Sequence, residues 1–342
     1  MTLFRWLTNA ALLLCFVVVV LGAYVRLSDA GLGCPDWPGC YGKLVVPEVA
    51  HPDYARPLEH AKAWKEMSHR YAASTLGLLI VALALLSRWI EDTPRRLPWV
   101  LFGLVVFQGA LGMWTVTLLL KPLVVTAHLL GGMTTLALLA WLRLSLPRSA
   151  QPEAPSGREP RNELEAFQRL DRTTDPVAPP AYLRATAALG LLLLAGQIFL
   201  GGWTSSNYAA LACPDLPTCH GQWQPELDLR EAFTLWRGLG VNYEYGVLDN
   251  RARVTIHFLH RVGAAVVSMF LLLLGAYLWR QNGVWRRLGI AMWVALAVQV
   301  GLGLSIVALQ LPLLLAAAHN AGAAVLLLVM ITLNHHAWRS PA

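Results

Sequence analysis

The sequence of 342 residues has few charged side chains: 14% of its residues are Asp, Glu, Lys or Arg, whereas 56% are hydrophobic. Soluble domains carry about 25% charged residues, so this composition excludes an ordinary soluble domain. Lipid offers no partner for unpaired backbone groups, so spanning segments of about 20 apolar residues are helices. We predict an all-α integral membrane protein with eight transmembrane helices, at residues 7–27, 66–90, 98–118, 122–145, 183–203, 254–279, 284–309 and 313–336.

The sequence also lacks a basic patch interleaved with aromatic residues, although its formal net charge is +7. This disfavours nucleic-acid binding. Arginines instead cluster in alternate loops, within 88–96, 143–184 and 280–287. By the positive-inside rule that side is cytoplasmic, and both termini lie there too, whereas the loops at 28–65 and 204–253 face outward.

The first apolar run lacks a small-x-small cleavage site after Tyr24, and a similar run recurs inside the chain as LLLLAGQIFLGGW. We therefore expect a retained helix rather than a signal peptide. The recurrence belongs to an internal repeat, in which CPDWPGCYG at Cys34 returns as CPDLPTCHG at Cys213. Three landmarks recur at a common offset of 191 residues: His69 with His260, Gln108 with Gln299, and His128 with His319.

Four predicted helices per repeat imply two tandem pseudo-symmetric four-helix bundles, related by an axis along the membrane normal. We place the N-terminal bundle at residues 1–145 and the C-terminal bundle at 183–342. Between them, residues 146–182 are rich in proline and charge and poor in apolar residues. This composition predicts a cytoplasmic linker that is mobile or partly helical around 163–170.

Only five cysteines are present, and four of them form two C-x5-C pairs in the outer loops. At this short separation outside the cytoplasm, each pair predicts a disulfide that closes a tight turn. A thiolate site for copper or zinc is the alternative. Cys15 lies in the first apolar run, where we expect a small buried side chain. The two pairs are Cys34 with Cys40 and Cys213 with Cys219.

Four of the ten histidines lie inside apolar segments, where ionisable groups are costly and usually functional. Each falls near the start of a helix that runs from outside to inside, so all four share a depth in the outer half of the bilayer. These histidines are His69, His128, His260 and His319. We expect five of the others to be solvated or interfacial, namely His51, His60, His220, His335 and His336.

Glycine or alanine stands three and four residues after each of these four histidines, on the same helix face. Such small residues either let helices approach closely or leave room for a flat ligand under the imidazole. Histidine is a common axial ligand of haem iron, so we predict two bis-histidine haem sites, His69 with His128 and His260 with His319. Zinc is the competitor, but it usually takes three or four protein ligands.

Charged residues accompany two of these histidines. Arg70 and Arg261 follow them directly and could bind haem propionates or extend to lipid headgroups. Glu66 precedes His69 by three residues, and its counterpart in the second repeat is His257. This asymmetry suggests that one site performs chemistry and the other holds a cofactor, although Glu66 could simply pair with Arg70.

The combination of Glu66, His69 and Arg70, followed by His128, the His260–Arg261 pair and His319, with the paired outer cysteines, resembles the haem A synthase family over nearly the whole chain. The resemblance implies an oxidoreductase that oxidises the C8 methyl group of haem O to a formyl group, making haem A for terminal oxidases. It implies that His260 and His319 ligate a haem b cofactor, that His69 and His128 hold the substrate haem, and that Glu66 acts in the chemistry. It also implies a Cys34–Cys40 disulfide near the substrate, with Cys213–Cys219 as the second pair.

The resemblance further implies a multi-pass protein of the bacterial inner membrane, with its haem sites toward the extracytoplasmic side. The expected partners are haem O as substrate and membrane lipid. The upstream haem O synthase, a membrane or soluble electron-transfer protein and a second copy of the chain are candidates that the sequence leaves open. Two other functions stay open. A dihaem b-type electron-transfer protein that oxidises quinol would keep both haems unmodified, and a transporter would show broken helices at matching midplane positions.

Overall fold

Eight long helices make up most of the computed structural model, which describes residues 1–49, 53–54, 56–91, 93–147 and 181–339. Each is long and apolar enough to cross a membrane, so the predicted number of spans is confirmed for the described part of the chain. The helices are α1 (Thr2–Leu27), α2 (His60–Leu86), α3 (Arg96–Thr117), α4 (Pro122–Ser145), α6 (Ala181–Ser206), α8 (Asn250–Trp279), α9 (Gly283–Ala308) and α10 (Leu313–Arg339), with a short α7 (Leu229–Ala232) in the loop between α6 and α8.

Several helices extend beyond the predicted apolar segments. The helix α2 begins at His60 and α8 at Asn250, whereas the apolar runs predicted starts at 66 and 254. Asp249 caps α8, because its Oδ1 atom accepts a hydrogen bond of 2.7 Å from the Ala252 amide. Hydropathy detects only the part of a helix that lies in lipid, so the polar first turns were missed.

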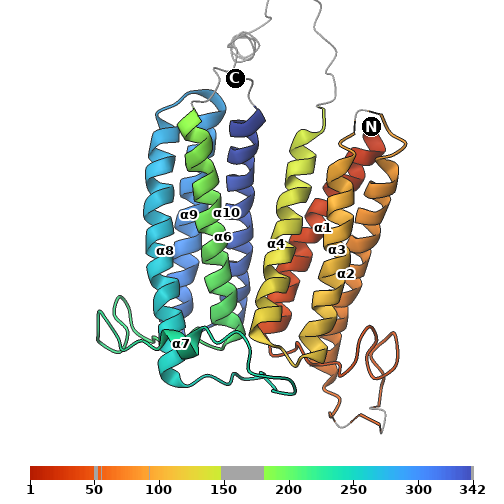
Figure 1. Cartoon of the computed structure of the whole chain (residues 1–342), viewed down its shortest axis with the longest axis vertical. Coiled ribbons are helices and arrows are strands. Elements are labelled where there is room, and N and C mark those ends of the chain that lie inside the picture. The colour runs from red at the N-terminus through yellow and green to blue at the C-terminus, as the bar shows by residue number, and fades with distance from the viewer. Residues whose placement is uncertain (50–52, 55, 92, 148–180, 340–342) are drawn as a thin grey trace, which may run out of the picture.

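The helices form two four-membered rings side by side (Figure 1). In the first ring, α1 and α3 each pack against both α2 and α4, and in the second, α6 and α9 each pack against both α8 and α10. Consequently α2 and α4 stand at opposite corners of one ring, and α8 and α10 at opposite corners of the other. Those four helices carry the four intramembrane histidines.

Polar contacts join the two rings at the end of the long loops. The guanidinium of Arg26 donates to the Ser205 carbonyl at 2.8 Å and stacks 4.1 Å from the Tyr208 ring centroid. Arg56 also forms an ion pair with Glu244 at 2.6 Å between the two loops. The helices α1 and α4 pack against α10, and α4 packs against α6, so the rings share an extensive interface.

The N- and C-terminal ends lie together at one end of the molecule, opposite the long loops (Figure 1). The predicted alternation of loops requires this arrangement. Which end faces the cytoplasm remains a prediction from the positive-inside rule. Most of the predicted linker, residues 148–180, lies outside the described residues.

Candidate functional site

His69 of α2 and His128 of α4 face each other across the first ring. Their ring centroids are 6.4 Å apart and the ring planes cross at 86°. A transition metal lies roughly 2 Å from a ligating imidazole nitrogen, so two rings on opposite sides of one ion have centroids roughly 6 Å apart. The spacing of this pair therefore fits one metal ion between the rings.

Only two protein ligands are available for such an ion. Among the described residues, no group of three or more His, Cys, Asp or Glu side chains could hold a metal. Zinc would need further protein ligands, whereas a porphyrin supplies the equatorial ligands of its iron and leaves two axial positions for histidine. The donor set of this ring therefore fits haem better than zinc.

His260 and His319 are at the corresponding corners of the second ring, on α8 and α10. Across the described residues, the Nδ1 atoms of His69, His128 and His319 are buried without a hydrogen-bond partner. Unpartnered buried polar atoms are rare in proteins and indicate a strained or functional position, which also fits ligand-binding histidines in both rings.

A glycine on the neighbouring helix contacts each of the four imidazoles. A Cβ atom added at Gly22 of α1 would lie 2.9 Å from Cε1 of His69, closer than real Cβ atoms approach. Sequence reasoning did not single out these glycines, although they recur at the offsets of the repeat. A Cβ atom added at the other three glycines would lie 3.6 Å from Cε1 of His128 for Gly112, 3.3 Å from Cε1 of His260 for Gly201, and 3.1 Å from Cε1 of His319 for Gly303.

Some of the small residues that follow the histidines also make room for polar side chains. Three of these glycines lie against the carboxamide of a glutamine on the adjacent helix, where an added Cβ would collide with it. The pairs are Gly131 with Gln108, Gly263 with Gln197, and Gly322 with Gln299. The tertiary structure therefore brings glutamines into the neighbourhood of the histidines.

Glu66 lies near the start of α2 with only 4% of its surface exposed. Its Oε2 atom accepts a hydrogen bond of 2.9 Å from the Cys34 amide, and its Oε1 atom accepts one of 2.5 Å from Arg70. Arg70 also donates to the carbonyls of Pro38 and Gly39. The ion pair between Glu66 and Arg70 is thus present, and both residues hold the first cysteine loop.

His257 occupies the equivalent position in the second ring. Its Nδ1 atom is 3.1 Å from the Cys213 amide nitrogen, and its Nε2 atom is 3.3 Å from Nε of Arg261. Arg261 also donates to the carbonyls of Cys213, Asp215 and Thr218 at 2.6, 2.8 and 2.8 Å. Both arginines are therefore engaged by loop carbonyls, and their contact with haem propionates stays a prediction.

The structure contains both predicted disulfides, Cys34–Cys40 and Cys213–Cys219. Disulfide-bonded cysteines have no thiolate to offer, which argues against the copper or zinc alternative. Cys15 is free and buried, as predicted. The cysteine loops lie against the N-terminal parts of α2 and α8, directly beside Glu66 and His257.

An aspartate organises each cysteine loop. Asp36 accepts hydrogen bonds from the amides of Tyr41 and Gly42, and Asp215 accepts from the Thr218 hydroxyl and the amides of His220 and Gly221. The hydrogen bond from Thr218, followed by that from the Gly221 amide, holds the pKa of Asp215 well below its usual range. The carboxylate form of Asp215 is therefore part of the folded loop.

The histidines outside the two pairs contact loops or helix ends. His60 and His220 lie against loop carbonyls, those of Glu48 at 3.1 Å and Ala212 at 2.8 Å. His335 and His336 lie at the other end of the molecule, where His335 is 3.3 Å from the Ser145 hydroxyl. His51 lies outside the described residues.

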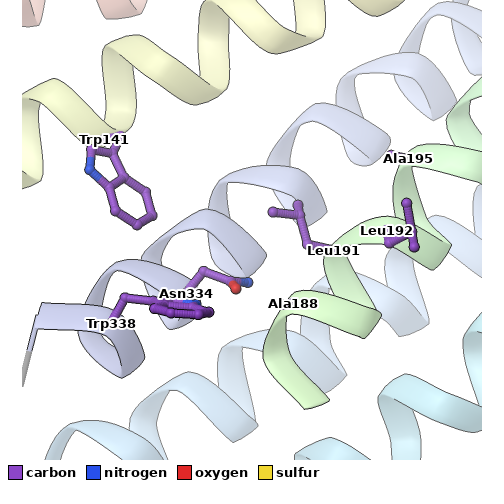
Figure 2. A pocket seen from close by; sticks show the side chains of 7 residues that line it. All are labelled: Trp141, Ala188, Leu191, Leu192, Ala195, Asn334 and Trp338. Carbon is purple, nitrogen blue, oxygen red and sulfur yellow. The ribbon is translucent and has the colours of Figure 1, made fainter. Parts of the chain in front are cut away.

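Two shallow grooves lie along the helices, and only the first is remote from the paired histidines. Figure 2 shows the first, of about 650 Å³, between α4, α6 and α10, lined by residues that include Trp141, Asn334 and Trp338. These residues lie toward the far end of α4 and α10 from the histidines. The second, of about 560 Å³, follows α9 and α10 from Arg287 to Gly322, one turn from His319.

Similarity to known proteins extends over the whole of this architecture. Residues 5–331 match the COX15-CtaA family, described as cytochrome oxidase assembly proteins. A heme A synthase of Shewanella oneidensis is 44% identical over 97% of this chain and 96% of its own length. A heme A synthase of Methylobacterium radiotolerans is 30% identical over 96% of this chain and 88% of its own length. One of Sphingopyxis alaskensis is 27% identical over 99% of this chain and 92% of its own length. The chain belongs to the COX15-CtaA family.

Proposed function

We propose that this membrane protein is a haem A synthase, which oxidises the C8 methyl group of haem O to a formyl group. Its family membership and the names of its relatives support this activity. The observation that carries it in the structure is the His69–His128 pair, whose centroid spacing of 6.4 Å fits one iron ion between two imidazoles. Haem A made in this way serves terminal cytochrome oxidases.

The two rings take different haems in this proposal. His69 and His128 hold the substrate haem O, and His260 and His319 hold haem b as a resident cofactor. The carboxylate of Glu66 supports this division, because the equivalent residue in the second ring is His257. When bound, haem b supplies one-electron transfer.

Glu66 is the residue that we assign to proton transfer. It shares a face of α2 with His69, three residues away, and its buried carboxylate is held between Cys34 and Arg70. If both histidines stay on the substrate iron, no position is left for dioxygen and water would supply the formyl oxygen; if one histidine lets go, dioxygen could reach the iron instead. In the first case the methyl group and water lose four electrons and four protons, and Glu66 accepts protons as a general base.

We place the protein in a bacterial inner membrane, with the histidine pairs toward the extracytoplasmic side. The position of the cysteine loops beside Glu66 and His257 supports this orientation, because disulfides form outside the cytoplasm. Electrons leave through a membrane or soluble electron-transfer partner. The upstream haem O synthase and a second copy of the chain are further candidate partners.

Chromatography of extracted haems tests the proposed function. The chain is produced together with a source of haem O, and haem A is the expected product. Exchange of both His260 and His319 for alanine should remove the haem b spectrum from the purified protein. Two unmodified b-type haems per chain and no haem A would instead identify a dihaem electron-transfer protein.

A further inference from the structure

The second long loop has more residues than its counterpart in the first half. The cysteine motifs recur at an offset of 179 residues and the histidine landmarks at 191, so twelve extra residues stand between Cys219 and His257. Residues 236–245 belong to this lengthened part of the loop, and we call them the bridging segment. Duplication alone gives the extra residues no use, but their contacts do.

The bridging segment starts from a fixed point on the second ring. The Nε1 atom of Trp203, near the end of α6, donates to the Ala232 carbonyl at 2.9 Å, and the Trp203 ring stacks on Phe233 with 6.1 Å between the centroids. Arg237 forms an ion pair of 2.6 Å with Glu231 of α7. The segment is therefore tied to α6 and α7 before it leaves the second ring.

Its other residues lie on the first half, against the turn that joins α3 to α4. The Tyr243 amide donates to the Leu119 carbonyl at 3.0 Å. The Tyr243 side chain is 4% exposed and packs in one apolar cluster with Leu120. Next to it, Glu244 pairs with Arg56 of the first long loop at 2.6 Å. A loop of the second half thus covers a turn of the first.

Lys121, the last residue before α4, is held most closely. It is 1% exposed, and its ammonium group donates to the Gly238 carbonyl at 3.1 Å. The same group lies over the ring of Trp236, 2.8 Å from the centroid. A cation attracts the face of an indole strongly when both are removed from water, so two residues of the bridging segment hold this lysine.

The equivalent turn of the second ring is more open. At the histidine offset of 191, Pro312 corresponds to Lys121. Gln310 is exposed and Leu311 partly exposed, whereas Leu120 in the first ring is 5% exposed. The lysine is therefore no feature of the repeat, and it occurs in the turn that the bridging segment covers.

The covered turn controls the start of α4. Leu119 and Leu120 have φ angles of 51° and 60°, which residues other than glycine keep only when their surroundings hold them there. The Lys121 carbonyl then accepts from the Val125 amide at 3.0 Å in the first turn of α4. His128 follows Lys121 by seven residues, two turns along the same face. A displacement at the start of α4 therefore moves His128.

We propose that Lys121 is a positioning residue for the substrate haem. The bridging segment holds Lys121, and through the start of α4 this contact sets where His128 stands against His69. The substrate site of the first half thereby depends on a loop of the second half, which gives the extra residues of that loop a use. This inference rests on the proposed function, because it takes His128 as a ligand of haem O.

Lys121→Ala removes both contacts of the ammonium group. In the purified full-length chain that carries haem b, it should bind haem O roughly 10-fold more weakly, because a desolvated cation–π contact and a charged hydrogen bond are lost. Part of the bound haem O should change from six-coordinate low-spin to five-coordinate high-spin iron, since His128 no longer reaches all of it. Absorbance titration and electron paramagnetic resonance measure the two effects.

Two controls belong to this experiment. Haem b in the same sample should stay bound and low-spin, whereas a general loss of stability would release both haems without raising the high-spin share. Arg230→Ala removes an exposed cation from the same loop and should bind haem O as the parent does.

Trp236→Ala is a second approach, because this residue is 57% exposed and its loss empties no core. It should raise the high-spin share less than Lys121→Ala does, since the Gly238 carbonyl still accepts from the lysine. The double variant should equal Lys121→Ala alone, because both changes act on one contact. Additive effects, or a parent-like spin state in both single variants, would overturn the inference.

His128→Ala separates the inference from the proposed function. If haem O binds to this variant with an unchanged spectrum, the proposed function fails. If the variant loses low-spin haem O while Lys121→Ala binds it like the parent, only the inference fails.

Discussion

Two loop clamps, Glu66 with Arg70 at the first cysteine loop and His257 with Arg261 at the second, are built alike around different residues. In the first, the Glu66 carboxylate accepts from both the Cys34 amide and Arg70. In the second, His257 stands between the Cys213 amide and Arg261, but a neutral imidazole accepts at only one of its nitrogens. A residue other than glutamate therefore holds this loop, so the fold alone does not require a carboxylate at this position, which supports the proposed chemical role of Glu66.

Of the variants that test the two clamps, Glu66→Gln should have the largest effect on turnover. Glutamine keeps the shape and one acceptor oxygen but cannot take a proton as a base. We expect conversion of haem O to fall by roughly 10²- to 10⁴-fold, while haem stays bound in both rings. Product chromatography and the absorbance spectrum of the purified protein measure the two effects separately.

Two further variants control this experiment. His257→Gln makes the same change of shape in the second clamp and should leave turnover close to that of the parent. Glu66→His copies the second clamp into the first and should be as inactive as Glu66→Gln. Substantial turnover by Glu66→His would remove the glutamate from the mechanism.

The glycines beside the imidazoles allow a finer contrast within the first ring. Alanine at Gly22 would place a Cβ atom 2.9 Å from His69, whereas at Gly112 the distance to His128 is an ordinary 3.6 Å. Overpacking of this kind typically costs about 1–3 kcal/mol. We therefore expect Gly22→Ala to weaken binding of the substrate haem, and Gly112→Ala to bind it nearly as the parent does, in titrations followed by absorbance.

His257→Glu places the glutamate of the first clamp in the second and should stabilise the second cysteine loop. A carboxylate can accept from the Cys213 amide and Arg261 together, so one donor that the imidazole leaves unsatisfied gains a partner. A hydrogen bond of this kind contributes on the order of 1 kcal/mol. Thermal unfolding in detergent should shift upward relative to the parent and to His257→Gln, and a downward shift would contradict the equivalence of the two clamps.

The smallest expected effect is a change in how strongly the Asp215 carboxylate protects the second cysteine loop from hydrogen exchange. Hydrogen bonds lower the pKa of the Asp215 carboxyl group in the folded loop. The carboxylate therefore stabilises the fold at pH values above its unfolded pKa of about 3.9. This stabilisation is lost only as the pH falls toward the lower pKa of the folded state. Hydrogen exchange of the Gly221 amide should stay slow as the pH approaches 4, after correction for the intrinsic rate. Asp215→Asn should exchange faster at neutral pH, and equal protection would contradict this role.

Local features of the chain predicted much of the fold. The eight spans follow from apolar runs of sufficient length, and the disulfides follow from cysteines close enough in sequence to meet in one turn. The pairing of His69 with His128 followed from matched depth on parallel helices, and their rings do face each other. The polar first turns of α2 and α8 were missed because hydropathy does not register helix outside lipid.

The sequence by itself determined the spans, the repeat, the histidine landmarks and the exchange of Glu66 for His257, because each depends on residue type and spacing along one segment. Only the tertiary structure decided what those residues touch. The glycines against the imidazoles, the carboxamide of Gln197 on His260, and the arginines on loop carbonyls all join different segments of the chain. Such contacts depend on which helix faces meet and at what height, and helical periodicity within one segment does not specify either.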